Sequence, residues 1–228
     1  MGKTGLKPID NMKPILIYCY DAYCGWCFGF SPVMKEIARQ YAGKLDIEVL
    51  SGGMLIDEYI APINKIAPVI LNEYQRVEEL AGVKFGNDFL WHAHHPNESD
   101  WVMNSEKPAI ALCILKELYP AEQLNFASDL QHALNVEGRD LDDDEAYRHL
   151  LNKYQLDEKS FFEKLHSEIY RDFSRQEFAM CRQLQVTAFP AVLLQASESQ
   201  FYLVARGYTP LTEIKHRLNA ILSELSDS

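Results

Sequence analysis

The chain has 228 residues, 47% of them hydrophobic, and a formal net charge of −11 from 33 acidic and 22 basic residues. This apolar content is enough for one large domain, or for one domain that carries an insertion. The acidic balance and the lack of a basic cluster argue against a nucleic-acid partner. No membrane partner is predicted either, because no apolar run approaches the roughly 20 residues that cross a bilayer.

Residues 1–12 are predicted to form an N-terminal tail, and Met12 is a candidate for the original start. The segment lacks a long apolar stretch followed by a small-residue cleavage site, which is the pattern of a secretory leader. We therefore expect a cytoplasmic protein. In that reducing compartment a C-x-x-C pair is more often catalytic or metal-binding than a structural disulfide.

The first predicted strand spans residues 14–20, an apolar run rich in β-branched and aromatic side chains. Apolar residues then recur at helical spacing from Phe30 to Tyr41, and Gly43 is suited to end this helix. Alternating apolar and polar residues in KLDIEVL predict a second strand, which ends at a Gly-Gly pair. A strand, a helix and a strand in this order form a βαβ unit and favour a parallel pairing.

These elements form the first half of a predicted domain, residues 13–54. Residues 55–171 show mostly helical periodicity punctuated by Pro and Gly, and are predicted to be a helical insertion. Residues 172–226 then supply a helix, two strands in a hairpin and a final helix. The predicted fold is α/β, in the order β-α-β, helical insertion, α-β-β-α.

Within the insertion, the stretch WHAHHPNESDW (residues 91–101) is predicted to be a loop. His92, His94 and His95 in this stretch could ligate a metal ion, but histidines in a loop are a weak signal. A polar loop anchored by its aromatic residues is the favoured interpretation. No metal site is predicted.

Cys24 and Cys27 form a C-x-x-C pair between the first strand and the first helix. A cysteine at a helix entry faces unsatisfied backbone N–H groups and the positive end of the helix dipole, and both stabilise a thiolate. A structural zinc site would need four ligands, and the sequence has no second C-x-x-C pair. Redox exchange is therefore favoured over a metal site or an inert pair, with Cys24 as nucleophile and Cys27 as resolving cysteine.

Two prolines agree with this interpretation. Pro32 lies within the predicted helix, five residues after Cys27, where it should kink the axis. Pro190 opens the third predicted strand, where the Phe189–Pro190 peptide can be cis. The backbone before Pro190 would then be free to pair with an extended polypeptide substrate.

The stretch DAYCGWCFGFSPVMKEIA, the GGM after the second strand, NSEKPAIAL and NVEGRDLDD together resemble the cytoplasmic, FrnE-like branch of the DsbA family of thioredoxin-fold proteins. This resemblance implies a thioredoxin fold with a helical insertion and a thiol–disulfide exchange activity on protein substrates. It implies Cys24 as nucleophile, Cys27 as resolving cysteine and Pro190 as cis-proline. No metal or organic cofactor is implied, and glutathione or a thioredoxin system could recycle the dithiol.

The resemblance also implies that Gly25, Trp26 and Phe189 flank the sulfurs and contact the substrate. Where DsbA has Pro-His between its cysteines, this chain has Gly25 and Trp26. Because Trp26 supplies no imidazolium to stabilise the thiolate, we expect a less oxidising pair than that of DsbA. The bulky Phe189 before the proline is expected to narrow the substrate groove.

Two other functions are consistent with this sequence. The fold could serve as a DsbA-like adaptor that presents partners, with the dithiol acting at most as a switch. Alternatively, the layout resembles kappa-class glutathione transferases and hydroxychromene carboxylate isomerases, which carry serine at the position of Cys24. The sequence makes no prediction of oligomeric state.

Three further cysteines and one acid need an interpretation. Cys19 and Cys113 are expected to be packed in the core, although Cys19 is close enough to the pair to be a third redox thiol. Cys181 is expected to pack from a helix; if exposed, it could be glutathionylated. Asp21, three residues before Cys24, could relay a proton or simply end the strand in a turn.

Overall fold

The computed structural model describes residues 13–226, so the predicted tail lies outside the described residues. The centre of the fold is a four-stranded sheet in the order β2-β1-β5-β6. Strand β1 (Ile15–Tyr20) pairs in parallel with β2 (Asp46–Ser51) and antiparallel with β5 (Ala191–Gln195). Strand β6 (Phe201–Arg206) completes an antiparallel hairpin with β5. The predicted parallel unit and the predicted hairpin are both confirmed.

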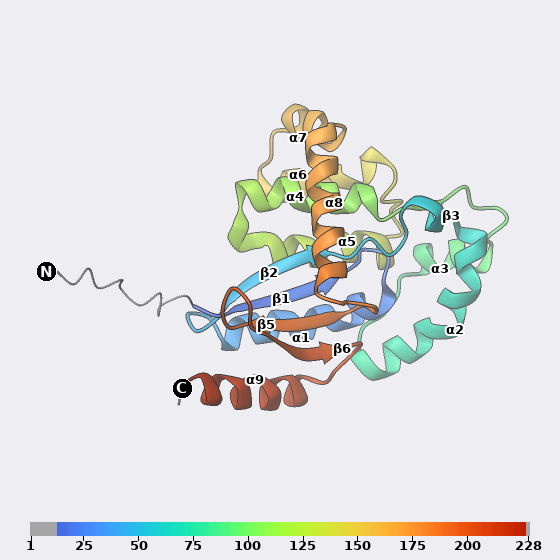
Figure 1. Cartoon of the computed structure of the whole chain (residues 1–228). Coiled ribbons are helices and arrows are strands. Elements are labelled where there is room, and N and C mark those ends of the chain that lie inside the picture. Colours follow the sequence, from blue (N-terminus) through green and yellow to red (C-terminus); the bar gives the residue numbers. More distant parts are fainter. Residues whose placement is uncertain (1–12, 227–228) are drawn as a thin grey trace, which may run out of the picture.

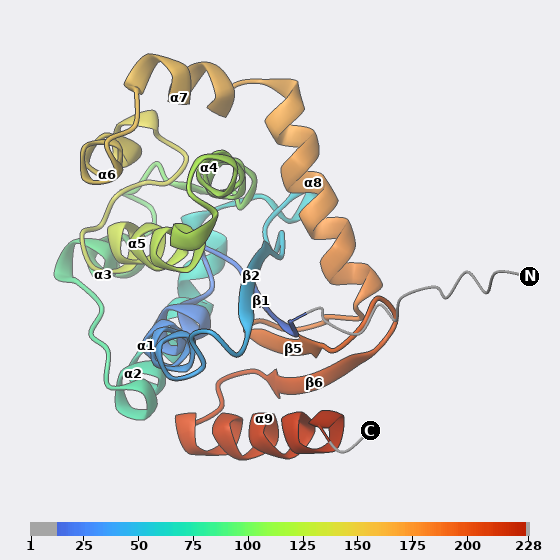
Figure 2. The same cartoon turned by 90° about the vertical axis from the view of Figure 1, so that its left-hand side faces the viewer.

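Helices cover both faces of this sheet (Figures 1 and 2). Helix α1 (Gly25–Gln40), which links β1 to β2, and helix α9 (Leu211–Ser226) lie on one side. Helix α8 (Glu168–Gln183) lies on the other. Because side chains alternate along a strand, Tyr18 and Tyr20 of β1 join the core under α1, whereas Cys19 joins a separate cluster under α8.

The region between β2 and α8 is mostly helical, as predicted. Its helices are α2 (Ile63–Ala81), α3 (Asn87–His94), α4 (Glu106–Leu118), α5 (Gln123–Asn135), α6 (Arg148–Tyr154) and α7 (Glu158–Leu165). Two short strands, β3 (Ala61–Pro62) and β4 (Val102–Met103), pair antiparallel within it and were not predicted, because two residues carry no readable alternation. Helix α8 runs through residue 171, so one continuous helix joins the insertion to the second half of the domain.

The predicted loop over residues 91–101 is wrong for its first four residues, which belong to α3. Phe89 and Ala93 are buried one turn apart and hold this short helix against the core. The histidine run that follows hid this spacing in the sequence. His92 stacks on Trp101, with ring centroids 3.8 Å apart, and the described residues contain no group of three or more His, Cys, Asp or Glu side chains placed to hold a metal ion.

None of the helices between residues 13 and 226 combines the length and the apolar character needed to cross a membrane.

Candidate active site

Cys24 is the N-cap residue of α1. Its backbone is extended (φ −82°, ψ 107°), and its sulfur accepts a hydrogen bond from the Cys27 N–H at 3.3 Å. The first N–H groups of a helix have no partner inside the helix, so a sulfur at this position takes the place of a capping oxygen. The dipole of α1 also favours negative charge at this end of the helix. The predicted location of Cys24 at a helix entry is confirmed.

Cys27 lies one turn into α1 and is fully buried. Burial raises the pKa of the Cys27 thiol well above its usual value, and the hydrogen bond with Cys24 and the negative charge of the Cys24 thiolate raise this pKa further. The two contributions from Cys24 disappear once its sulfur is bonded to another sulfur. Cys27 is therefore held as a thiol while Cys24 is free, and it loses its proton more easily after Cys24 has reacted.

The loop before β5 reaches the sulfur of Cys24 from the far end of the chain. The Phe189–Pro190 peptide is cis, as the sequence suggested, and the Phe189 carbonyl oxygen lies 3.6 Å from the Cys24 sulfur. Thr187 and Ala188, just before this peptide, are exposed. The loop thus places exposed residues next to the peptide that contacts Cys24.

A glycine makes room for Phe189. A Cβ atom added at Gly52 would lie 2.0 Å from the Phe189 ring, which is far inside van der Waals contact. Gly52 follows β2, and its N–H donates to the Tyr20 carbonyl at 2.7 Å. In the sequence the Gly-Gly pair was only a strand terminator and a family marker. Its structural role is to let the aromatic ring pack against the backbone next to the site.

Asp21 holds the turn that leads into Cys24. Its carbonyl accepts from the Cys24 N–H at 3.1 Å, and its carboxylate accepts from the N–H groups of Tyr23 (3.0 Å) and Met54 (2.7 Å) and from the Ser105 hydroxyl (2.9 Å). Burial raises the pKa of Asp21, whereas these hydrogen bonds act in the opposite direction. The turn role suggested by the sequence is confirmed, and a proton-relay role stays a prediction.

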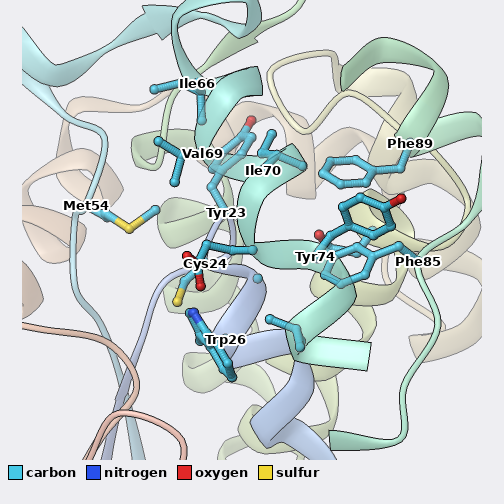
Figure 3. A pocket seen from close by; sticks show the side chains of 14 residues that line it. Tyr23, Cys24, Trp26, Met54, Ile66, Val69, Ile70, Tyr74, Phe85 and Phe89 are labelled. Carbon is cyan, nitrogen blue, oxygen red and sulfur yellow. The ribbon is translucent and has the colours of Figure 1, made fainter. Parts of the chain in front are cut away.

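A pocket opens beside Cys24 (Figure 3). Its volume is about 160 Å³. One wall carries Cys24 and Trp26. Most of the remaining lining consists of apolar and aromatic side chains of α2, the segment after it and α3, including Ile66, Val69, Ile70, Tyr74, Phe85 and Phe89. Sequence reasoning missed this pocket, because the apolar face of α2 has the same spacing as a face packed in the core.

The residues expected to contact substrate surround Cys24 from two sides. Gly25 and Trp26 line the pocket, and a Cβ atom at Gly25 would come within 3.4 Å of the Phe85 ring. The Trp26 ring lies 5.8 Å from the Arg76 guanidinium carbon, which stacks over it. Phe189 does not line the pocket and instead approaches the sulfur through its carbonyl.

The remaining cysteines lie away from this site. All five cysteines are free and buried. Cys113 packs in the core as predicted, and Cys19 and Cys181 lie together on the α8 side of the sheet. The alternative of an exposed Cys181 open to glutathionylation is wrong, since only 1% of this residue is exposed.

A scan of protein-family models matches the DsbA-like thioredoxin domain to residues 15–219. The chain belongs to the DsbA-like thioredoxin family. The match covers the helical insertion as well as the sheet, so the family includes the whole architecture described above. A search of curated protein sequences finds no match.

Several solved structures share the family fold. A Nitrosomonas europaea protein named as a candidate protein disulfide isomerase has a TM-score of 0.80 at 23% identity, with 93% of this chain and 99% of that chain covered. The cytosolic disulfide reductase DsbM of Pseudomonas aeruginosa has a TM-score of 0.75 at 22% identity, with coverages of 92% and 98%. A 2-hydroxychromene-2-carboxylate isomerase has a TM-score of 0.65 at 14% identity, with coverages of 93% and 98%. At these identities the likeness concerns the fold.

Proposed function

We propose that this protein is a thiol–disulfide oxidoreductase that exchanges disulfides with protein substrates through Cys24 and Cys27. The observation that carries the proposal is the position of the Cys24 sulfur. It caps α1, accepts from the Cys27 N–H at 3.3 Å, and lies 3.6 Å from the carbonyl of the cis-proline loop. A sulfur in this position is prepared to act as a thiolate nucleophile beside backbone that can hold a substrate chain.

The exchange takes place in two steps. The Cys24 thiolate attacks one sulfur of a substrate disulfide, a Cys24–substrate disulfide forms, and the other substrate sulfur leaves as a thiolate and takes a proton. Cys27 then loses its proton and attacks the Cys24 sulfur, which releases the second substrate thiol and leaves a Cys24–Cys27 disulfide. The substrate gains two electrons and the protein loses two. The pKa of Cys27 favours this order, because the contributions from Cys24 that raise it end with the first step.

We propose the reducing direction and a cytoplasmic location. Trp26 contributes no cation beside the Cys24 sulfur, which leaves the thiolate less stabilised than an adjacent imidazolium would. The structural neighbour DsbM is a cytosolic disulfide reductase, which supports the same direction by analogy of fold. Glutathione or a thioredoxin system would return the disulfide to the dithiol.

The pocket beside Cys24 supports a preference for substrates with an apolar or aromatic side chain next to the reacting cysteine. Its walls are largely apolar, and it lies directly beside the reacting sulfur. An apolar or aromatic side chain next to the substrate cysteine would bury its surface there, with Trp26 and Gly25 at one edge. Phe189 and the exposed backbone at Thr187 and Ala188 would contact the chain on the other side of the sulfur.

A glutathione-dependent transferase or isomerase is the second candidate. One specific observation favours it: a pocket of about 160 Å³ has the size for a small apolar molecule rather than a long chain. A DsbM structure with glutathione shares the fold at a TM-score of 0.71. Cys24 argues against it, because the isomerases that this layout resembles carry serine there.

A trapping experiment tests the proposal. The Cys27→Ala variant, incubated with soluble extract of the source cells and quenched with acid and alkylating agent, should accumulate reducible protein adducts at Cys24, because the resolving thiol is missing. The double variant Cys24→Ala/Cys27→Ala is the matched control and should give none. Recovery of Cys24 as a free thiol, or capped by glutathione alone, would contradict protein-disulfide exchange and move the glutathione-dependent candidate ahead.

A further inference from the structure

A second pair of thiols lies on the face of the sheet opposite the candidate active site. Cys19 of β1 and Cys181 of α8 belong to one small buried cluster, whose other buried members are Ile17, Leu50, Ala191 and Leu193. Cys19 is 0% exposed and Cys181 is 1% exposed. No part of the exchange chemistry proposed above uses either thiol.

The two thiols face each other because of the alternation along β1. Tyr18 and Tyr20 point toward α1, so Cys19 between them points toward α8. Cys181 is on the face of α8 that meets the sheet, and its thiol lies 3.6 Å from the Ser51 carbonyl oxygen of β2. Cys19 pairs with Leu50 across β1 and β2, and Ser51 is the next residue of β2, so the two thiols meet at the same place on this face of the sheet.

We propose that Cys19 and Cys181 form a second, oxidation-sensitive dithiol that closes into a disulfide between β1 and α8. The bond would join two elements that are far apart in the sequence but adjacent in the fold. It would form within an apolar cluster that excludes large reagents, so the oxidant must be small. Hydrogen peroxide, which is close to water in size, meets this requirement.

The reaction with peroxide balances in two steps. One thiol attacks a peroxide oxygen and gives up its proton as the O–O bond breaks, so that a sulfenic acid and one water are produced. The other thiol then attacks the sulfenic sulfur, the S–O bond breaks, and a second water leaves as the S–S bond forms. In total two thiols and one peroxide give one disulfide and two waters. A reducing thiol reverses the closure.

Closure would tie α8 to the sheet without blocking Cys24. The cluster is contiguous with the cis-proline loop, because Phe189 packs against it and Ala191 pairs with Cys19 across β1 and β5. The Cys24 sulfur nevertheless lies on the other side of the sheet, at the start of α1. The disulfide would therefore stabilise the fold under oxidising conditions, and it would take no part in disulfide exchange at Cys24. The long loop that it closes predicts a large effect on thermal unfolding, with the midpoint raised by roughly 10 °C.

The experiment uses the variant Cys24→Ser/Cys27→Ser, in which only Cys19, Cys113 and Cys181 remain. The folded protein is treated with a small excess of hydrogen peroxide, its free thiols are alkylated, and its peptides are examined by mass spectrometry. The expected product is a Cys19–Cys181 cross-linked peptide, with Cys113 still alkylated as an internal control. The thermal midpoint should rise on oxidation and return with dithiothreitol.

Matched variants distinguish the effect of the Cys19–Cys181 disulfide from other effects of peroxide. Cys113→Ala should keep both the cross-link and the shift in midpoint, whereas Cys181→Ala should lose both. The parent protein, which needs no substitution to fold, should give two separate disulfides, Cys19–Cys181 and Cys24–Cys27. Recovery of Cys19 and Cys181 as free or singly oxidised residues would overturn the proposal, as would a cross-link that forms only in urea. Since no turnover is measured, neither result bears on the exchange activity proposed for Cys24.

Discussion

The Cys24–Cys27 pair and the Cys19–Cys181 pair lie on opposite faces of one sheet and differ in their surroundings. Cys24 caps a helix, adjoins a pocket and contacts the cis-proline loop, and these three features support the nucleophilic role proposed for its sulfur. Cys19 and Cys181 lie among mostly apolar side chains in the middle of a strand and of a helix, and neither lines the pocket beside Cys24. Burial alone does not distinguish the pairs, because Cys24 is itself only 6% exposed.

The comparison leads us to expect that reactivity toward large molecules depends on where the buried sulfur lies. The position at the end of a helix supplies N–H donors and a favourable dipole, which a position in the middle of a strand or helix does not. The exposed loop beside Cys24 is the partner that we propose for the substrate backbone. For a thiol pair without these features we expect reaction only with small oxidants.

The largest expected difference between the pairs is in turnover. Cys24→Ser should reduce disulfide-reductase activity at least about 1,000-fold, because a hydroxyl at this position is not ionised and forms no mixed disulfide. Cys181→Ala, a matched change on the other face, should leave activity within about twofold. The activity is measured with a peptide disulfide and a glutathione-recycling system. Equal losses in the two variants would contradict the separation of the two faces.

The next expected effect is one that the two pairs share, a loss of stability at alkaline pH. Burial raises the pKa of Cys27 in the folded state, and Cys19 together with burial raises that of Cys181. Unfolded thiols ionise from about pH 9, while the folded ones keep their protons. Each thiol therefore makes its full contribution to the free energy of unfolding below that pH. Above it, the free energy of unfolding falls by about 1.4 kcal/mol per pH unit for each thiol.

Urea unfolding with reductant at pH 8, 9 and 10 measures this slope. Cys181→Ala and Cys27→Ala should each make this slope shallower by the contribution of one proton. Each should also lower the free energy of unfolding by an amount that does not depend on pH, because packing contacts are lost. A slope unchanged in Cys181→Ala would show that this thiol ionises as readily in the folded protein as in the unfolded chain.

The smallest expected effect concerns the reduction potential of the Cys24–Cys27 pair. Trp26→His places an imidazole beside Cys24, and its protonated form stabilises the thiolate of the reduced protein, so the reduction potential should rise by about 30 mV or more. Equilibration with glutathione buffers, read by alkylation and mass spectrometry, gives the potential. Trp26→Phe keeps an aromatic ring without a cation and should stay within about 10 mV of the parent. A similar rise in both variants would mean that the ring, and not the charge, sets the potential.

Much of the fold was readable from local patterns. The run before Cys24 predicted β1, the spacing from Phe30 to Tyr41 predicted α1, and the mostly helical block after β2 is present. These features depend on residues within a few positions of each other, where strand alternation and helical periodicity are strong signals. The same local logic placed Cys24 at a helix entry and Cys27 one turn later.

The sequence by itself therefore determined the place of the Cys24–Cys27 pair at the start of a helix and the proline that comes directly before β5. Tertiary structure alone decided which distant residues meet. It brings the carbonyl of Phe189 to Cys24 and the Phe189 ring to the backbone of Gly52. It also turns the apolar face of α2 toward the pocket and places Cys181 in one cluster with Cys19. The physical reason is that alternation shows which side chains share a face of a strand or helix. It does not show which segment covers that face, and this depends on contacts between residues far apart in the chain.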